Sequence, residues 1–251
     1  WPIFIRGYEH LPHAMLDRVV GGLMRRERPR WLVAALIQFW VKRGRIDLSE
    51  VEVEHWPTLE AFFLRRLRAG ARPIGEGLVA PVDGVMVQSG AAADGLVVKG
   101  HALDVAALIG GPLGFEANVA TVFLTPDGYH HVHAPEHLRI IATRSIAGRS
   151  FPQNDDALAL RPEVYLANAR VVVQAETERG PMLLVLVAAS LISGIHVVAA
   201  GTYAKGDRIG GFSFGSTVVM LWPREWGACE RGAGERVKLG DRELAVREEA
   251  A

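Results

Sequence analysis

The sequence predicts an α+β protein in which amphipathic helices precede a mostly antiparallel β domain. Two observations predict this class. Apolar residues recur at a spacing of three to four over the first third of the chain, which is typical of helices. From about residue 79 onward, short apolar or alternating runs are separated by glycine, proline and aspartate turns, which is typical of strands. Helices followed by a series of strands indicate α+β architecture.

Three helices are expected in the N-terminal part of the chain. The first covers about residues 11–24. The second covers about residues 31–43 and stops at Gly44. The third covers residues 59–68, with Thr58 as its N-terminal cap.

Strands are expected in the remainder, and only residues 103–109 have the pattern of an interrupting helix. The clearest strand signals cover residues 96–99, 119–124, 138–146, 169–175, 182–187, 195–200, 217–221 and 236–239. We therefore expect two parts, a helical segment over residues 1–70 and a β-rich domain over residues 71–251.

The composition is that of an ordinary globular protein, with 49% apolar and 22% charged residues. Lys plus Arg and Asp plus Glu both total 28, so no overall charge favours nucleic acid as a partner. Residues 1–46 nevertheless contain nine basic and three acidic side chains, a sum of +6. This asymmetry indicates an anionic surface facing the N-terminal part. Cys229 is the only cysteine, so neither an internal disulfide nor a cysteine metal cluster is expected.

Residues 80–84 form the first of three stretches that contain residues suited to catalysis. Asp83-Gly84 is a common turn dipeptide, and a turn is its simplest interpretation. The functional interpretation makes Asp83 a carboxylate that orients a histidine.

The second stretch contains three histidines within four positions, His130, His131 and His133. On an extended strand, His131 and His133 point to one face and His130 to the other. Such a cluster suits a solvated surface, a zinc site with His-x-His on a strand, or acid–base catalysis. The metal alternative lacks an obvious set of carboxylate or cysteine ligands.

The third stretch is Gly215-Ser216-Thr217, which follows a glycine-rich run and leads into the apolar residues 218–221. A glycine before Ser216 leaves its own carbonyl sterically open and allows strained backbone conformations. The alternative is a glycine-rich loop that simply enters a strand. A phosphate-binding loop does not fit, because no lysine follows at the P-loop spacing and no helix begins there.

In this order, the three stretches resemble the phosphatidylserine decarboxylase family. The motifs are Pro-x-Asp-Gly, Tyr-His-x-Val-His and Gly-Ser-Thr, and the likeness covers nearly the whole chain. Weaker similarities lie at Phe62-Phe63 with Arg65 and at residues 72–74, 99–101, 180–182 and 205–206.

The resemblance implies that the chain cuts itself between Gly215 and Ser216. The products are a β chain of residues 1–215 and an α chain of residues 216–251. The resemblance further implies that Ser216 becomes a covalent pyruvoyl cofactor, and no metal is expected.

The resemblance also assigns roles to the side chains of the three stretches. Asp83, His133 and Ser216 match the self-processing triad, with His133 as the base and Asp83 orienting its imidazole. His130 matches the histidine assigned to the decarboxylation step. His131 stands where arginine is common in the family, which removes a permanent positive charge from this position.

The implied reaction converts phosphatidylserine to phosphatidylethanolamine, so a membrane surface is an expected partner. The basic N-terminal helices with Trp31, Phe39 and Trp40 predict contact with anionic lipid. The structural alternative is that these helices only cover the β domain. We expect a peripheral membrane protein at the cytoplasmic face of a bacterial cell membrane, with a homodimer as a further expectation.

Three other functions remain open from the sequence. One is a pyruvoyl-dependent decarboxylase of a small amino acid, since fold and cofactor do not dictate the acyl chains. Another is an inactive family member that binds lipid, and a zinc hydrolase is the third.

Overall fold

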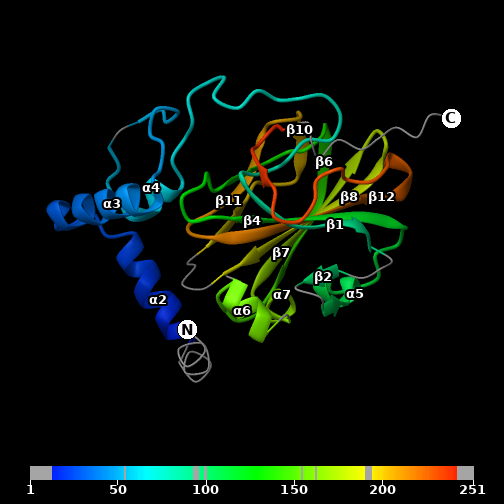
Figure 1. The fold of residues 1–251 in the computed structure, drawn as a ribbon, viewed down its shortest axis with the longest axis horizontal. Coiled ribbons are helices and arrows are strands. Elements are labelled where there is room, and N and C mark those ends of the chain that lie inside the picture. The colour runs from blue at the N-terminus through cyan, green and yellow to red at the C-terminus, as the bar shows by residue number, and fades with distance from the viewer. Residues whose placement is uncertain are drawn as a thin grey trace.

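The computed structural model describes residues 13–53, 55–92, 96–98, 101–153, 155–161, 163–189 and 194–241. It confirms the α+β class, because N-terminal helices lie beside a domain built on an antiparallel sheet (Figure 1). The helices are α2 (His13–Met24), α3 (Arg30–Gly44), α4 (Leu59–Phe63), α5 (Val105–Ile109), α6 (Asp155–Leu160) and α7 (Val164–Ala167), with a 3-10 turn η2 (Arg224–Trp226). The strands are β1 (Gly84–Ala91), β2 (Leu96–Val98), β3 (His101–Leu103), β4 (Ala117–Leu124), β5 (His131–His133), β6 (Leu138–Ile146), β7 (Arg170–Thr177), β8 (Gly180–Ala188), β9 (Ile195–Val197), β10 (Gly201–Tyr203), β11 (Arg208–Phe212), β12 (Ser216–Pro223) and β13 (Arg236–Val237).

The main sheet has eight strands in the order β10-β6-β7-β8-β12-β4-β1-β13. A three-stranded sheet, β5-β11-β9, and the hairpin β2-β3 accompany it. Strand β12 is central, with antiparallel ladders to β4 on one side and β8 on the other. The strand that follows Gly215 is therefore held along both of its edges.

Both faces of β12 are buried, and all eight of its residues lie in the interior. Val218 and Met220 pack into the core on one face of the sheet, whereas Val219 and Leu221 pack into the core on the other. This explains why the sequence shows a continuous apolar run here, since a strand covered on both faces has no solvent side to keep polar.

The helices α3 and α4 pack together at one side of the main sheet (Figure 1). Val33 and Ile37 are the buried residues of α3, and they share a core with Phe62 and Phe63 of α4. No helix of the described residues is long and apolar enough to cross a membrane.

The third helix is shorter than expected, because α4 ends at Phe63 and not near residue 68. The following residues turn back, and Leu67 forms a β-bridge with Val51. Arg68 continues this pairing, since its backbone N–H donates to the Glu50 carbonyl at 2.8 Å. The second helix ends at Gly44 as expected, and Arg45 after it adopts the left-handed conformation.

The expectation of a single helix within the β domain is wrong, since α6 and α7 also lie there. These helices have six and four residues, too few for a helical period to show in the sequence. Leu158, Val164 and Tyr165 anchor them in the second core, so tertiary packing and not local pattern stabilises them.

Candidate active site

Ser216 is the first residue of β12 and lies opposite Leu124 of β4 and Ala188 of β8. Its side chain is fully buried, and its hydroxyl has no hydrogen-bond partner among the described residues. Burying an unpartnered hydroxyl costs about 1–3 kcal/mol, and a catalytic role is one reason for a protein to retain such a group. The preceding Gly215 is loosely surrounded, since a Cβ placed there would lie 3.8 Å from the Leu124 carbonyl oxygen.

His130 contains a second unpartnered polar atom. Its ring is fully buried, and Nδ1 lies 3.0 Å from the carbonyl oxygen of Gly128. Because a carbonyl only accepts, Nδ1 carries the proton and Nε2 keeps its lone pair. This Nε2 has no partner within the described part of the chain. Burial, followed by the charge of Arg65, lowers the pKa of His130 to about 4, so the ring is neutral at pH 7.

His131 and His133 lie on the opposite side of the segment from His130, as expected for an extended strand. Both pack against the ring of Tyr129, with centroid distances of 5.1 and 5.6 Å, whereas His130 packs edge-on against Phe63. His131 Nε2 donates to the Leu64 carbonyl at 2.9 Å. Burial lowers the pKa of His131 to about 4, so this residue adds no positive charge at pH 7.

His133 has partners at both ring nitrogens. Nδ1 donates to the Gly206 carbonyl at 2.6 Å, so Nε2 accepts from the Tyr129 hydroxyl at 2.9 Å. Burial lowers the pKa of His133, while the Gly206 carbonyl and the Asp83 carboxylate oppose that shift. Burial raises the pKa of Tyr129 to about 12, so its hydroxyl keeps its proton at neutral pH.

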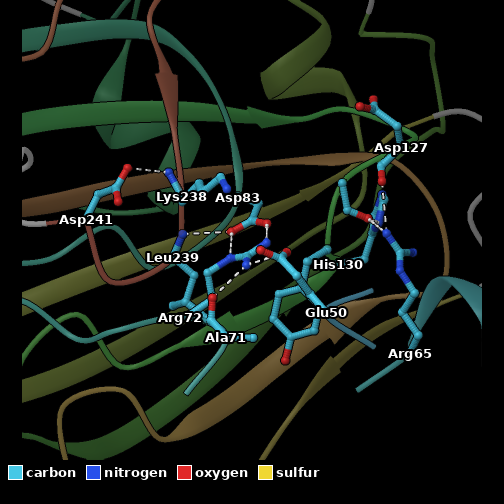
Figure 2. Close-up of polar contacts among 12 residues, drawn as sticks. Glu50, Arg65, Ala71, Arg72, Asp83, Asp127, His130, Lys238, Leu239 and Asp241 are labelled. Carbon is cyan, nitrogen blue, oxygen red and sulfur yellow. Dashed lines mark hydrogen bonds and ion pairs between the residues drawn. The ribbon is translucent and has the colours of Figure 1, made fainter. Parts of the chain in front are cut away.

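Asp83 is held by Arg72 and not by a histidine (Figure 2). The Arg72 guanidinium makes a bidentate contact. Its Nε–H donates to Asp83 Oδ1 at 3.1 Å, and its Nη2–H donates to Asp83 Oδ2 at 2.7 Å. The backbone N–H of Leu239 donates to Oδ1 at 2.8 Å, and Glu50 binds Arg72 Nη1 at 2.6 Å. Within the described residues, Asp83 acts on His133 through its charge and not through a hydrogen bond.

Arg65 fixes the turn that precedes the histidines. Its buried guanidinium donates Nη2 to the carbonyls of Asp127 and Gly128, at 2.9 and 2.7 Å (Figure 2). The Gly128 carbonyl also accepts from His130, so one backbone oxygen joins the arginine to the imidazole. Burial lowers the pKa of Arg65 to about 10, which still leaves it charged at neutral pH.

The structure thus divides the four predicted site residues between different hydrogen-bond partners. Ser216 Oγ and His130 Nε2 are buried without a partner in the described ranges, His133 is bonded to Tyr129, and Asp83 is bonded to Arg72. In the described part of the chain, no three His, Cys, Asp or Glu side chains form a group that could hold a metal ion.

Sequence reasoning did not identify Arg72 and Tyr129 as site residues. Both had a sequence signal. Tyr129 opens the Tyr-His-x-Val-His motif, and Arg72 begins one of the weaker similarities. Only the folded structure shows that Tyr129 contacts His133 and that Arg72 contacts Asp83.

Comparisons with a family model and with individual proteins lead to the same family. The sequence model of a family described as phosphatidylserine decarboxylase matches residues 59–245. A protein from Ectopseudomonas mendocina (strain ymp), named phosphatidylserine decarboxylase proenzyme, is 34% identical over 276 positions, covering 95% of this chain and 96% of that protein. Proteins of the same name from Alcanivorax borkumensis and Pseudomonas entomophila are 35% and 33% identical, over 85% and 95% of this chain and 84% and 96% of their own lengths.

Proposed function

Because this chain belongs to the phosphatidylserine decarboxylase family, we propose that it cuts itself before Ser216 and then decarboxylates phosphatidylserine to phosphatidylethanolamine. The family model and the relatives confirm the family that the motifs predict. The observation that carries the proposal is the buried Ser216 hydroxyl, which follows a loosely surrounded glycine and has no partner among the residues that the structure describes.

In the first step, the Ser216 hydroxyl loses its proton and adds to the carbonyl carbon of Gly215. The carbon–nitrogen bond then breaks, the nitrogen takes up a proton, and the amide becomes an ester. Loss of the Cα proton of residue 216 breaks the Cβ–O bond and releases the carboxylate of Gly215. The dehydroalanine left behind tautomerises to an imine, and water replaces its nitrogen to give a pyruvoyl carbonyl and ammonia.

We assign the base of this step to His133 and its electrostatic support to Asp83. The Gly206 carbonyl keeps the proton on Nδ1, so Nε2 presents the lone pair that a general base needs. In the uncut chain that lone pair accepts from the Tyr129 hydroxyl. For the cutting step, the Ser216 hydroxyl replaces the Tyr129 hydroxyl as the hydrogen-bond donor to His133 Nε2. The charge of Asp83 favours the imidazolium that results.

The surroundings of Ser216 fit a pyruvoyl group. The ladders of β12 to β4 and β8 are independent of the bond before Ser216, so the 36 residues from 216 to 251 stay bound after the cut. The buried Thr217 hydroxyl donates to Gln153 Oε1 at 2.7 Å and holds the end of the strand. When present, the pyruvoyl carbonyl supplies the electron sink for loss of carbon dioxide. His130 Nε2, buried and neutral, is suited to take up and return a proton during turnover.

The test separates cutting from turnover. The unsubstituted chain should give two fragments by gel and intact mass, and Ser216→Ala should remain whole and inactive. His133→Ala should also remain whole, whereas His130→Ala should cut but lose about 10²–10⁴-fold in carbon dioxide release. Asp83→Ala should cut slowly, because it removes charge support and not a hydrogen bond. A chain that stays whole at neutral pH, or His133→Ala that cuts normally, would contradict the assignment.

The substrate is tested in the same assay. Release of carbon dioxide from phosphatidylserine vesicles, with none from soluble serine, is the expected result. The reverse would assign a small amino acid as substrate. Binding to vesicles without cutting or turnover would indicate an inactive lipid-binding protein.

We further propose that α2 and α3 rest on the anionic membrane that contains the substrate, which makes this a peripheral protein of the cytoplasmic face. Met15, Val19 and Leu23 form an exposed apolar stripe at a spacing of four along α2. On α3, Trp31 and Phe39 are 73% and 58% exposed. Basic side chains follow α2 and flank the apolar part of α3, namely Arg25, Arg26, Arg28, Arg30, Lys42 and Arg43. Exposed apolar side chains beside such a cluster suit the headgroup boundary of anionic lipid.

The membrane proposal predicts a salt-sensitive interaction. Replacing Arg26, Arg28 and Arg30 together by glutamine should weaken flotation with vesicles containing phosphatidylserine, by about 1 kcal/mol per arginine at low salt. Raised salt should weaken the unsubstituted protein in the same way. The matched control replaces Arg139, Arg161 and Arg224, arginines of the β domain whose side chains are 36–62% exposed, and should bind normally. Binding that ignores both charge and salt would contradict the proposal.

A further inference from the structure

The three residues before Ser216 connect β11 to β12, and each has a distinct environment. Ser213 is 1% exposed, although its hydroxyl is polar. Phe214 packs among aromatic rings of the helical segment. Gly215 provides the carbonyl that the proposed cutting step attacks. The contacts of Ser213 and Phe214 therefore determine how this carbonyl is presented.

The Ser213 hydroxyl lies between a carboxylate and an imidazole. Its Oγ is 2.8 Å from Glu60 Oε1 and 3.0 Å from His196 Nε2. A carboxylate only accepts, so the hydroxyl gives its proton to Glu60 and accepts from the Nε2–H of His196. The backbone N–H of Ser213 donates to the Gly194 carbonyl at 3.2 Å. The hydroxyl and the backbone N–H of Ser213 are therefore both engaged.

Phe214 is held by two rings from the helical segment. Trp40 of α3 lies edge-on to it at 5.5 Å, and Phe63 of α4 lies edge-on at 4.8 Å. Trp40 and Phe63 also contact each other at 5.7 Å, so the three rings form one cluster. Edge-on contacts of this kind are directional, and they fix the orientation of Phe214 as well as its position.

Downstream of the scissile bond, the chain is fixed in a different way. Ser216 belongs to the ladders of β12, which involve backbone groups of β4 and β8. The peptide bond between Gly215 and Ser216 therefore joins a segment held by α3, α4 and β9 to a segment held by the main sheet. Gly215, with its loose surroundings, is the point where the two must match.

We propose that Glu60 is a positioning residue for self-cleavage, which through Ser213 and with His196 sets the Gly215 carbonyl against the Ser216 hydroxyl. The inference rests on the proposed cutting step and assigns part of it to the helical segment. Attack of a side-chain hydroxyl on the carbonyl of the preceding residue tolerates little error in the angle of approach. A displacement of about 1 Å costs as much as 100-fold in rate when it disturbs such an alignment.

The experiment measures the half-time of cutting in newly synthesised, pulse-labelled chains. Glu60→Met keeps the length of the side chain and removes the acceptor, and Ser213→Ala removes the hydroxyl. Both should cut between about 10-fold and 100-fold more slowly. Glu60→Gln retains an oxygen that accepts from Ser213, and it should cut within about threefold of the unsubstituted chain. Glu176→Met, at an exposed site of the β domain, is the matched control and should cut normally.

Turnover distinguishes a positioning role from a general loss of stability. Glu60, Ser213 and His196 all remain in the fragment 1–215, so cutting does not separate them. Once cutting is complete, Glu60→Met should turn over substrate within about twofold of the unsubstituted enzyme per cut molecule. Melting temperatures measured with Ser216→Ala added exclude a misfolded variant. If Glu60→Met fails to fold, the half-time of cutting by Ser213→Ala, the smaller change, tests the inference.

Two results would overturn the inference while leaving the proposed function intact. One is normal cutting by both Glu60→Met and Ser213→Ala. The other is slow cutting by Glu60→Gln equal to that of Glu60→Met, which would show that the charge and not the hydrogen bond matters. An unsubstituted chain that never cuts would overturn the proposed function, and the inference with it.

Discussion

Replacing Arg72 by methionine tests how Asp83 is held. The two side chains are only 10% and 13% exposed, and Arg72 supplies two of the three hydrogen bonds that Asp83 accepts from the described part of the chain. Removing one partner of a buried pair costs about 3–5 kcal/mol. Both groups retain some solvent and Leu239 still donates, so we expect the lower end, about 3 kcal/mol. Asp83→Leu should cost about 2 kcal/mol, because Arg72 keeps Glu50 as a partner.

The double replacement removes both charges and should cost less than the sum of the two single changes. We expect a coupling energy of about 2 kcal/mol between Arg72 and Asp83. The assay is urea unfolding of all four chains with Ser216→Ala added, so that each remains one polypeptide. The same cycle on Arg139 and Glu176, an exposed pair, serves as control and should give about 0.2–1 kcal/mol. A coupling below about 0.5 kcal/mol for Arg72 and Asp83 would refute the reasoning.

Three further predictions follow from other contacts. Tyr129→Phe removes the donor at His133 Nε2 and should cut at least as fast as the unsubstituted chain; loss of cutting on a gel would show that the hydroxyl itself carries the proton. The unfolded chain binds more protons at His131 than the folded one between pH 6.5 and 4, so stability falls as the pH falls. Between these two pH values, His131→Gln should reduce the loss in the free energy of unfolding by on the order of 3 kcal/mol, measured by urea unfolding. An unchanged pH dependence would contradict the burial argument. Gly84→Ala would press a Cβ against the carbonyl of Phe123 and should cost about 1–3 kcal/mol, whereas a neutral effect would contradict the close approach of β1 and β4.

Gly84 shows how one residue can be identified correctly and interpreted incompletely. Its dipeptide with Asp83 predicts a turn, yet Gly84 is the first residue of β1 and pairs with Val237. Its lack of a side chain allows the backbone of β4 to approach, a requirement that no local pattern encodes. The turn interpretation concerns neighbours in sequence, whereas the observed constraint comes from a strand more than thirty residues away.

The sequence by itself determined the α+β class, the central apolar strand after Ser216 and the family. These follow from periodicity and from motifs, which are properties of adjacent residues. The tertiary structure alone decided that Asp83 binds Arg72, that His133 binds Tyr129 and that the Ser216 hydroxyl finds no partner among the described residues.

The connection between the helical segment and the proposed cutting site is of the same kind. Glu60 and Ser213 are 153 positions apart, and nothing near either residue indicates the other. Hydrogen-bond partners at such a separation depend on how the strands and helices pack, and each buried polar group must find its partner or remain without one. The sequence therefore predicted candidate catalytic residues, and only the fold determined what holds each of them in place.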